Sequence, residues 1–432
     1  MVDRNVALAM MACFLLSLFC GCARKEGEKV ITFTVGGAPS EVEVWRHMAR
    51  QFEDQSGLKV HLLRQPTDTD QRRQGLVVSL KSKKADPDVF LMDVAWIAQF
   101  AASGWLEPLD ASLEKAKAGP QVFFQSVLQT ADTFKDHLIA LPVYIDGGLL
   151  YYRKDLLQKY GYARPPGTWP ELLAYSLRIQ EEERKMNPDF YGFVWQGAQY
   201  EGLVCTFLEF SGSRGGEIIS EGGNVLFNSA PNGEALQYMY DLIHTYKVSP
   251  PNTFTEMKEE EVRLFFQQGK ALFERNWPYA WALHQGMDSP VRDKVGLAPL
   301  PHAPEGQSVS TLGGWHIGIS RYSDAKEESF QFLLFVTSYI AQKKLALTLG
   351  WNPARTDVYQ DTEILEKMPH FSTLGEVFEK ACARPALPYY TLISEVVQRQ
   401  VNGVLSGKIT PQRALSTGQK EIQEIMIRYE GR

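Results

Sequence analysis

The stretch ITFTVGG, residues 31–37, alternates β-branched and aromatic residues with polar ones and ends in a glycine pair. This pattern predicts a strand followed by a tight turn. Residues 42–55 then carry apolar side chains at helical spacing and stop before Gly57, which predicts a helix. The alternation continues with a strand at 58–63, a helix at 71–84, a buried strand at 88–92 and a helix at 95–103. Strands and helices alternating at this spacing favour an α/β fold with a parallel or mostly parallel sheet.

The rest of the chain is more mixed, and its last part is largely helical. Further elements are predicted for a strand at 149–152 and for helices near 169–185, 233–246, 374–380, 393–405 and 411–429. A length of 432 residues suits two or three domains of roughly 150 residues each. The sequence therefore predicts two α/β lobes and a helical C-terminal region.

The overall composition excludes some classes of function. The net charge of −6 is spread along the chain and no basic block is present, so no nucleic-acid partner is expected. No Cys/His cluster has metal-ligand spacing, and neither a nucleophile elbow nor a phosphate-cradling loop is present, so neither a metal nor a cofactor is expected. A glycosidase needs only two well-placed carboxylates, and the sequence leaves that possibility open. Cys205 and Cys382 are far apart and are predicted to be buried free thiols.

The N-terminus has the pattern of an export signal. Arg4 precedes an uncharged apolar run, residues 6–19, which is shorter than the roughly 20 residues that span a bilayer. A small residue before Cys22 resembles a bacterial lipoprotein cleavage site, which predicts a signal at 1–21, lipid on Cys22 and a linker at 22–29. The flanking residues FC, 19–20, are unusual in such a site, so a plain cleaved signal or an uncleaved anchor are the alternatives.

Charged side chains at the ends of predicted strands are candidates for a binding site, because ligands of open α/β sheets bind beyond the carboxyl ends of the strands. Glu41 and Asp93 hold such positions, and Asp146 follows Tyr144 after the apolar stretch 139–144 that leads to the strand at 149–152. A carboxylate can accept hydrogen bonds from two hydroxyls at once. Capping of the following helix is the alternative for Asp93. Arg72, at a helix start, and Arg384, between helical regions, can each pair with acids or donate to a ligand.

Aromatic residues are concentrated in RNWPYAW, residues 275–281. On an extended chain Trp277 and Tyr279 point to the same side, so they are predicted to form a two-ring platform, with Pro278 holding the chain extended. Trp281 shares this parity; we expect it in the core, and the sequence leaves its place open. Other aromatic candidates are Tyr144, Trp315 and Trp351, the last two directly after glycines. Carboxylates beside aromatic faces suit a sugar, whose hydroxyls need polar partners and whose C–H faces stack on rings.

Several stretches resemble the solute-binding subunits of bacterial ABC importers, most closely the trehalose/maltose-binding proteins of the maltose-binding family. They are DPDVFLMDVAWIAQFAASGWLEPLD (86–110), ALPVYIDGGLLYYRKDLLQKYGY (140–162), FERNWPYAW (273–281), TLGGWHIGIS (311–320) and GWNPAR (350–355). The resemblance extends from Ile31 to Tyr429.

This resemblance implies a two-lobed periplasmic-binding-protein fold with a ligand cleft. The N-terminal lobe would comprise 30–145 and 320–352, and the C-terminal lobe 146–319 and 353–432. Hinge segments would cross near 144–146, 319–320 and 352–353.

The resemblance also implies roles for individual residues. Hydroxyl groups would be held by Glu41, Arg72, Asp93, Asp146 and Arg384. Trp277 would stack on a sugar ring, with Tyr279 beside it. Gly314 would supply backbone contacts and Trp315 aromatic contacts. Tyr144 would line the cleft.

The function implied is that of an exported, monomeric sugar receptor, periplasmic or at the cell surface, anchored to a membrane through lipid on Cys22. It would capture an α-linked disaccharide, close about its hinges and deliver the sugar to a membrane permease. Alternatives are the same fold with another oligosaccharide or a polyol as ligand, or a secreted glycoside hydrolase.

Overall fold

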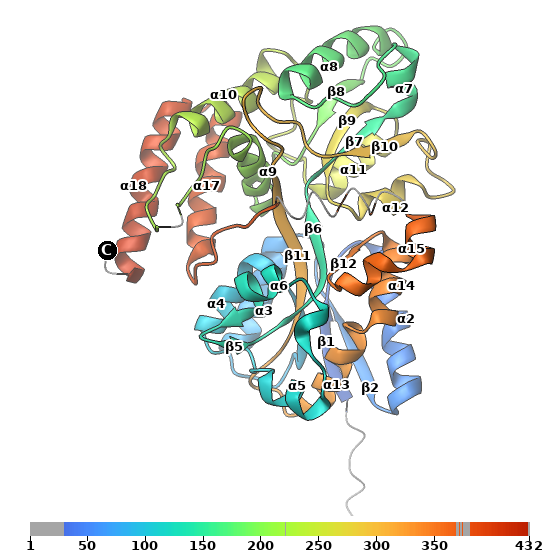
Figure 1. The fold of residues 1–432 in the computed structure, drawn as a ribbon. Helices are drawn as coiled ribbons and strands as arrows, with labels where there is room; N and C mark the ends of the chain where they lie inside the picture. Colours follow the sequence, from blue (N-terminus) through green and yellow to red (C-terminus); the bar gives the residue numbers. More distant parts are fainter. Residues whose placement is uncertain (1–29, 221, 369–370, 372–373, 375–380, 431–432) are drawn as a thin grey trace, which may run out of the picture.

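The computed structural model describes residues 30–220, 222–368, 371, 374 and 381–430, which form two lobes joined by extended segments (Figure 1). The predicted signal, the linker, Cys22 and most of the predicted helix 374–380 lie outside the described residues.

The first lobe is built on a sheet in the strand order β12-β6-β11-β3-β1-β2. Its strands are β1 (Val30–Val35), β2 (Lys59–Arg64), β3 (Val89–Asp93), β6 (Leu141–Gly147), β11 (Ser310–Ile319) and β12 (Asn352–Pro353). Strand β1 pairs in parallel with β2 and β3, as the alternation of strands and helices predicts, whereas β11 runs antiparallel to β3 and β6.

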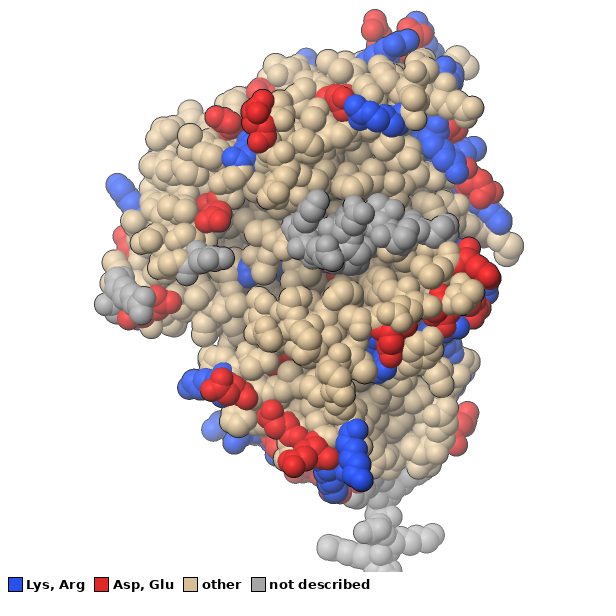
Figure 2. Space-filling view, viewed as in Figure 1, with Lys and Arg blue, Asp and Glu red and all other residues tan. Residues whose placement is uncertain are grey.

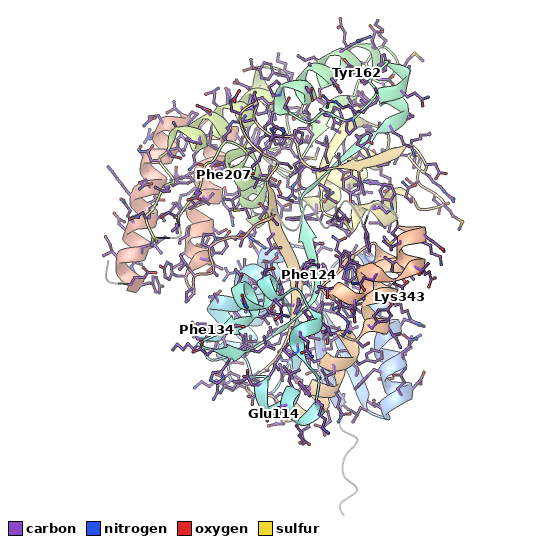
Figure 3. All side chains as sticks on the ribbon, in the orientation of Figure 1. Glu114, Phe124, Phe134, Tyr162, Phe207 and Lys343 are labelled. Carbon is purple, nitrogen blue, oxygen red and sulfur yellow. The ribbon has the colours of Figure 1, made fainter. Side chains whose placement is uncertain are left out.

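The helices of the first lobe cover this sheet and bury its apolar side chains. They are α2 (Pro39–Ser56), α3 (Thr69–Lys81), η2 (Val94–Trp96), α4 (Ile97–Ala102), α5 (Asp110–Ala116), η3 (Pro120–Val122), α6 (Gln125–Val127), η4 (Leu128–Asp132), α13 (Lys326–Val336) and α14 (Tyr339–Leu349), with a small hairpin of β4 (Thr133–Phe134) and β5 (His137–Leu138). After β12, η5 (Thr356–Gln360) and α15 (Thr362–Lys367) pack against α14 and bury Val358 and Ile364 in an apolar cluster with second-lobe residues. In the core, Phe33 packs edge-on against Trp45 and Phe332. Phe124 and Phe134 lie in this lobe, and Phe207 lies in the other (Figure 3).

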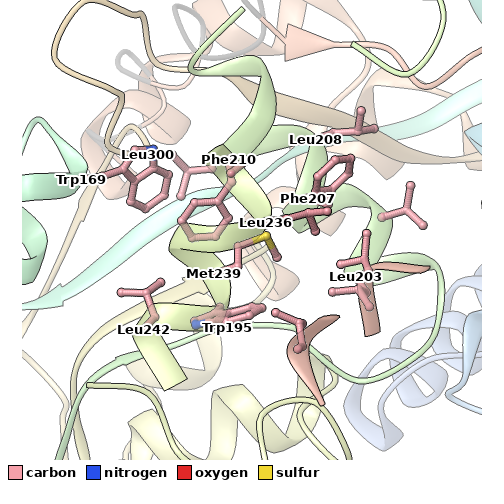
Figure 4. Packing of buried hydrophobic residues seen from close by; sticks show 14 of the residues in the cluster. Trp169, Trp195, Leu203, Phe207, Leu208, Phe210, Leu236, Met239, Leu242 and Leu300 are labelled. Carbon is pink, nitrogen blue, oxygen red and sulfur yellow. The ribbon is translucent and has the colours of Figure 1, made fainter. Parts of the chain in front are cut away.

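The second lobe contains a mixed sheet in the order β10-β7-β9-β8. The strands are β7 (Leu149–Arg153), β8 (Tyr191–Val194), β9 (Ala271–Asn276) and β10 (Val295–Ala298), and the helices are α7 (Lys154–Lys159), α8 (Trp169–Glu183), α9 (Glu201–Gly212), α10 (Ala230–His244), α11 (Glu259–Gln267), α12 (Ala280–His284), α17 (Tyr390–Leu405) and α18 (Pro411–Glu430). Trp169 stacks on Phe210 at 4.2 Å between ring centroids, above Leu236 and Met239 (Figure 4). Helices α17 and α18 pack against α9 and α10 (Figure 1), so the predicted helical C-terminus completes this core.

The strand pairing corrects one predicted lobe boundary. Residues 310–319 were assigned to the C-terminal lobe, but β11 pairs with β3 from Trp315 to Ile319 and with β6 from Leu312 onward, so it belongs to the first sheet. The chain therefore crosses at the start of β11 rather than near 319–320. Three glycines within this strand weaken its sequence signal. The other crossing from β6 lies at Gly148, two residues beyond the predicted 144–146 segment.

Surface features agree with the absence of a basic block in the sequence. Charged side chains of both signs are mixed over the face shown in Figure 2. Among the described residues no single helix is long and apolar enough to span a membrane. Only α13 and α14 taken together, with a bend of 55° between them, reach the length and apolar composition of a membrane span. Cys205 is buried as predicted, but Cys382 is exposed, because it lies in the short edge strand β13 (Ala381–Cys382) beside β11.

Candidate functional site

A cavity of about 660 Å³ lies between the two lobes and is lined by residues from both. All ten predicted site residues line it: Glu41, Arg72, Asp93, Tyr144, Asp146, Trp277, Tyr279, Gly314, Trp315 and Arg384. Residues separated by more than 300 positions in the chain are thus brought to one place by the carboxyl ends of the first sheet and the facing edge of the second lobe.

Glu41 is positioned by the start of helix α2. Pro39 occupies the first helical turn, where its missing N–H costs no hydrogen bond. Glu41 Oε2 accepts a hydrogen bond from the Ala38 N–H at 2.9 Å and so fixes the side chain at the cavity wall. Burial raises the pKa of Glu41 to about 7, and the nearby Arg72 opposes this shift.

Arg72 reaches the cavity from helix α3, and 5% of its surface is exposed. Its guanidinium carbon lies 3.6 Å from the centroid of the Trp315 ring, a cation–π arrangement. Trp315 in turn packs edge-on against Trp96 at 5.3 Å. Within the described part of the chain, Arg72 Nε has no hydrogen-bond partner. Burial lowers the pKa of Arg72 to about 10, so it remains a cation at neutral pH.

Asp146 and Tyr144 come from the end of strand β6. Asp146 is 9% exposed, and its Oδ1 finds no hydrogen-bond partner among the described residues. Burial, followed by repulsion from Glu41 and Asp93, raises the pKa of Asp146 to about 8. Tyr144 stacks on Trp351 with ring centroids 3.9 Å apart, so Trp351 supports the floor of the cavity as well as the core.

Gly314 brings backbone close to the cavity. Its φ of +137° and a Cβ that would lie only 2.6 Å from the Tyr144 carbonyl oxygen both require glycine. The neighbouring Gly313 leaves room for the Trp277 ring, since a Cβ there would lie 3.2 Å from the ring edge.

The structure corrects the predicted conformation of RNWPYAW. Strand β9 ends at Asn276, Pro278 and Tyr279 form a turn, and helix α12 begins at Ala280. The segment is therefore not extended, because Pro278 starts a turn rather than continuing the strand. Trp277 and Tyr279 nevertheless both line the cavity, and Trp281 packs, partly buried, against an apolar cluster of the second lobe.

The two rings are held by glutamates at the start of helix α11. Trp277 Nε1 donates to Glu259 Oε1 at 3.4 Å, and the Tyr279 hydroxyl donates to Glu260 Oε1 at 2.7 Å. The Tyr151 hydroxyl donates to the Trp277 carbonyl at 2.8 Å. These contacts fix both rings at the cavity wall.

Arg384 joins acids of both lobes and is 6% exposed. Its Nη2 lies 2.8 Å from Asp93 Oδ1 and its Nη1 donates to Glu201 Oε1 at 3.0 Å. Asp93 Oδ1 also accepts from the Ala95 N–H at 2.9 Å, so the aspartate is both a helix cap and a member of the site.

Some residues that line the cavity were not predicted from the sequence. Glu201, the first residue of α9, accepts from the Tyr390 and Ser394 hydroxyls as well as from Arg384. Lys258 of the second lobe pairs with Asp68, the N-cap of α3 in the first. An acid at a helix start or a run such as KEEE, residues 258–261, is typical of a solvated surface, so no local signal identifies them.

Carboxylates dominate the chemistry of the cavity. Nine acids line it: Glu41, Asp68, Asp93, Asp146, Glu201, Glu256, Glu259, Glu260 and Glu261; the three cations are Arg72, Lys258 and Arg384. The walls thus offer many hydrogen-bond acceptors, a few fixed donors and aromatic faces, which suits a neutral molecule rich in hydroxyl groups.

Two α/β lobes with a polar, aromatic-lined cavity between them define a solute-binding protein of the periplasmic-binding type. Residues 38–343 match the model of a family described as bacterial extracellular solute-binding protein. The chain belongs to this family and is the substrate-binding component of an ABC importer.

Individual relatives support the same assignment. A probable ABC transporter-binding protein of Deinococcus radiodurans is 36% identical over 399 residues, 91% of this chain and 93% of the relative. The maltose-bound structure of MalE3 from T. maritima is 40% identical, with a TM-score of 0.86 over 92% of this chain and 99% of that one. A solute-binding protein from Thermotoga lettingae bound with α-D-tagatose is 28% identical, with a TM-score of 0.84 over 92% and 100%. The predicted fold is confirmed, and these relatives are solute-binding proteins rather than enzymes.

Proposed function

We propose that this protein captures an α-linked disaccharide of the trehalose/maltose type in the interlobe cavity and delivers it to the permease of an ABC importer. The observation that carries the proposal is a pair of polar atoms in the wall, Asp146 Oδ1 and Arg72 Nε, that have no hydrogen-bond partner among the described residues. Both side chains are more than nine-tenths buried, and leaving a buried polar group without a hydrogen bond costs about 1–3 kcal/mol. A hydroxyl-rich ligand would satisfy both.

The other walls suit the rest of a sugar. Trp277 and Tyr279 offer ring faces for the C–H surface, while Glu41 and Asp93 offer carboxylate oxygens to hydroxyls. A cavity of about 660 Å³ lies within the range of about 300–1,000 Å³ common for small-molecule sites. Lobe closure over the ligand would then exclude water, because binding favours the closed state over the open one.

A second class of ligand competes with an α-linked disaccharide for this cavity. The similar structures hold maltose in one case and α-D-tagatose in the other, so another oligosaccharide or a polyol is the competing ligand class. Calorimetric titration with trehalose, maltose, sucrose, maltotriose and mannitol separates them. Saturable binding of trehalose or maltose, tighter than of the others, supports the proposal. The proposal would be wrong if the protein bound only mannitol, or if none of the disaccharides bound.

A glycoside hydrolase would hold the same sugars but cleave them. Incubation of the purified protein with trehalose or maltose, followed by an assay for free glucose, distinguishes the two activities. A receptor releases the bound sugar intact. More moles of free glucose than moles of protein would establish an enzyme instead.

Export and anchoring form a separate part of the proposal. We expect the mature chain to begin at Cys22 with lipid attached and to act as a monomer in the periplasm or at the cell surface, where more than one acyl chain is needed for stable attachment to a membrane. Cys22→Ala should move the protein from the membrane fraction to the soluble fraction. Equal membrane recovery of both forms would contradict the lipid anchor.

A further inference from the structure

A buried ion pair lies directly behind the Trp277 ring, outside the cavity wall. Arg275 and Glu209 are each 1% exposed, and Arg275 Nε donates to Glu209 Oε2 at 2.7 Å while Nη2 donates to Oε1. The guanidinium carbon lies 4.0 Å from the Trp277 ring centroid. The ring therefore has a charged planar group on one side and also lines the cavity.

The same pair contacts two of the segments where the chain crosses between the lobes. The Thr311 N–H, at the start of β11, donates to Glu209 Oε1 at 3.2 Å. At the other crossing, a Cβ on Gly148 would lie 2.1 Å from Glu209 Oε1 and 2.6 Å from Arg275 Nη2. The two crossings are tied to each other as well, since Ser310 Oγ donates to the Gly148 carbonyl at 2.7 Å.

The plain alternative is an ion pair that only stabilises the second lobe. Buried ion pairs give little net stability, because desolvation offsets their attraction, so this role alone explains neither the placement nor the contacts. The pair does not lie at an arbitrary place in the core. It touches Trp277, one of the two rings proposed to face the ligand, and two of the segments that cross between the lobes.

We propose that Arg275 and Glu209 are positioning residues that couple the Trp277 ring to the hinge, so that ligand contact with the ring favours lobe closure. The inference rests on the proposed function in taking Trp277 as a ligand contact. The guanidinium fixes the ring, Glu209 fixes the guanidinium through two hydrogen bonds, and the Thr311 N–H fixes Glu209. A shift of either crossing strand therefore moves the ring, and a ligand that immobilises the ring selects one hinge geometry.

Two variants test this coupling from opposite ends. Glu209→Gln keeps the shape of the side chain but removes its charge. Gly148→Ala presses on the pair from the hinge side and changes no group in the cavity. Gly192→Ala is the matched control, because it also adds a methyl group to a buried position of the second lobe, and the three atoms nearest to the new Cβ all belong to Ser176.

With maltose or trehalose as probe, Glu209→Gln and Gly148→Ala should raise the dissociation constant by about 5- to 150-fold, the range typical of coupled sites. They should also reduce the sugar-induced contraction seen by small-angle X-ray scattering. Gly192→Ala should lower the melting temperature and leave both quantities unchanged. A lower melting temperature with unchanged affinity and contraction in the two test variants would overturn the coupling.

A ligand-free measurement separates this inference from the proposed function. Fluorine NMR of fluorotryptophan-labelled protein reports the Trp277 ring, whose resonance is assigned by its loss in Trp277→Phe. Gly148→Ala should shift or broaden that resonance without any sugar, and Gly192→Ala should not. An unmoved Trp277 resonance in Gly148→Ala overturns the coupling even if sugars bind, and failure of every sugar to bind overturns only the proposed ligand.

Discussion

The Arg384 guanidinium lies 2.8 Å from Asp93 Oδ1, and this contact joins the segment leading into α17 of the second lobe to the end of strand β3 in the first. Because the same guanidinium donates to Glu201, one cation separates two acids that closure of the lobes brings together.

Replacing Arg384 by methionine should favour the open state. In the closed form Asp93 and Glu201 would face each other without a cation, and breaking a buried pair costs about 3–5 kcal/mol. Opening the cleft exposes both acids to water. The free-energy cost should therefore destabilise the closed state relative to the open state more than it lowers the free energy of unfolding. We expect a larger radius of gyration by X-ray scattering and weaker sugar binding, with a small change in melting temperature. A large fall in melting temperature with unchanged scattering would place Arg384 in a rigid core instead.

Lys258 and Asp68 form a second contact between the lobes, partly exposed at 36% and 16% of their side-chain surfaces. Such pairs contribute about 0.2–1 kcal/mol and weaken with salt. A double-mutant cycle of Lys258→Met and Asp68→Asn on sugar affinity should give a coupling in this range that shrinks at high salt. Asparagine retains the cap on α3, where Asp68 accepts from the Gln71 N–H.

The exposed pair Lys115–Glu327 provides the control for this cycle, since both residues belong to the first lobe. Its disruption should leave sugar affinity unchanged. Equal effects of the two pairs on affinity would mean that Lys258 and Asp68 do not act on closure.

Asp146→Asn should change how stability depends on pH. The pKa of Asp146 is about 8 in the folded protein against an ordinary value of 3.8, so between about pH 4 and pH 8 the folded state holds a proton that the unfolded state releases. Stability from this group therefore falls as pH rises through that window. We expect the ligand-free variant to be more stable than the wild type at pH 9, with the difference vanishing towards pH 4, measured by thermal unfolding. A pH-independent difference would contradict the raised pKa.

The sequence was sufficient for the residues that follow strands. Glu41, Asp93 and Asp146 could be predicted because strand periodicity fixes where a strand ends, and parallel strands end at one edge of the sheet. Residues such as Lys258 and Glu201 could not, because their role depends on which lobe surface they meet after folding. For Trp277 and Tyr279 the predicted location held while the predicted extended backbone was wrong: a turn at Pro278 also brings both rings to the cavity.

Anionic sugars should bind poorly. Nine acidic residues and three cations line the cavity, so the acids outnumber the cations even with Asp146 protonated at neutral pH. Arg384 and Lys258 are already paired with acids. Juxtaposed like charges cost several kcal/mol, so trehalose 6-phosphate should show no measurable heat of binding at concentrations that saturate trehalose. Affinities of the two sugars within tenfold of each other would show that Arg72 accommodates a phosphate.

Trp277→Ala and Trp281→Ala should have opposite consequences, although only four positions separate them. Trp277 lines the cavity, so its loss removes a stacking surface from the ligand and should weaken sugar binding by about 10- to 100-fold, equivalent to about 1.4–2.8 kcal/mol. Trp281 lies in helix α12 and packs against the apolar cluster that includes Val262 and Phe266, so truncation leaves a void in the second lobe. Its loss should lower the melting temperature and leave affinity near that of the wild type. Calorimetry measures the sugar affinity of both variants, and thermal unfolding measures their melting temperatures. Unchanged affinity in Trp277→Ala and weakened affinity in Trp281→Ala would exchange the roles assigned to the two rings.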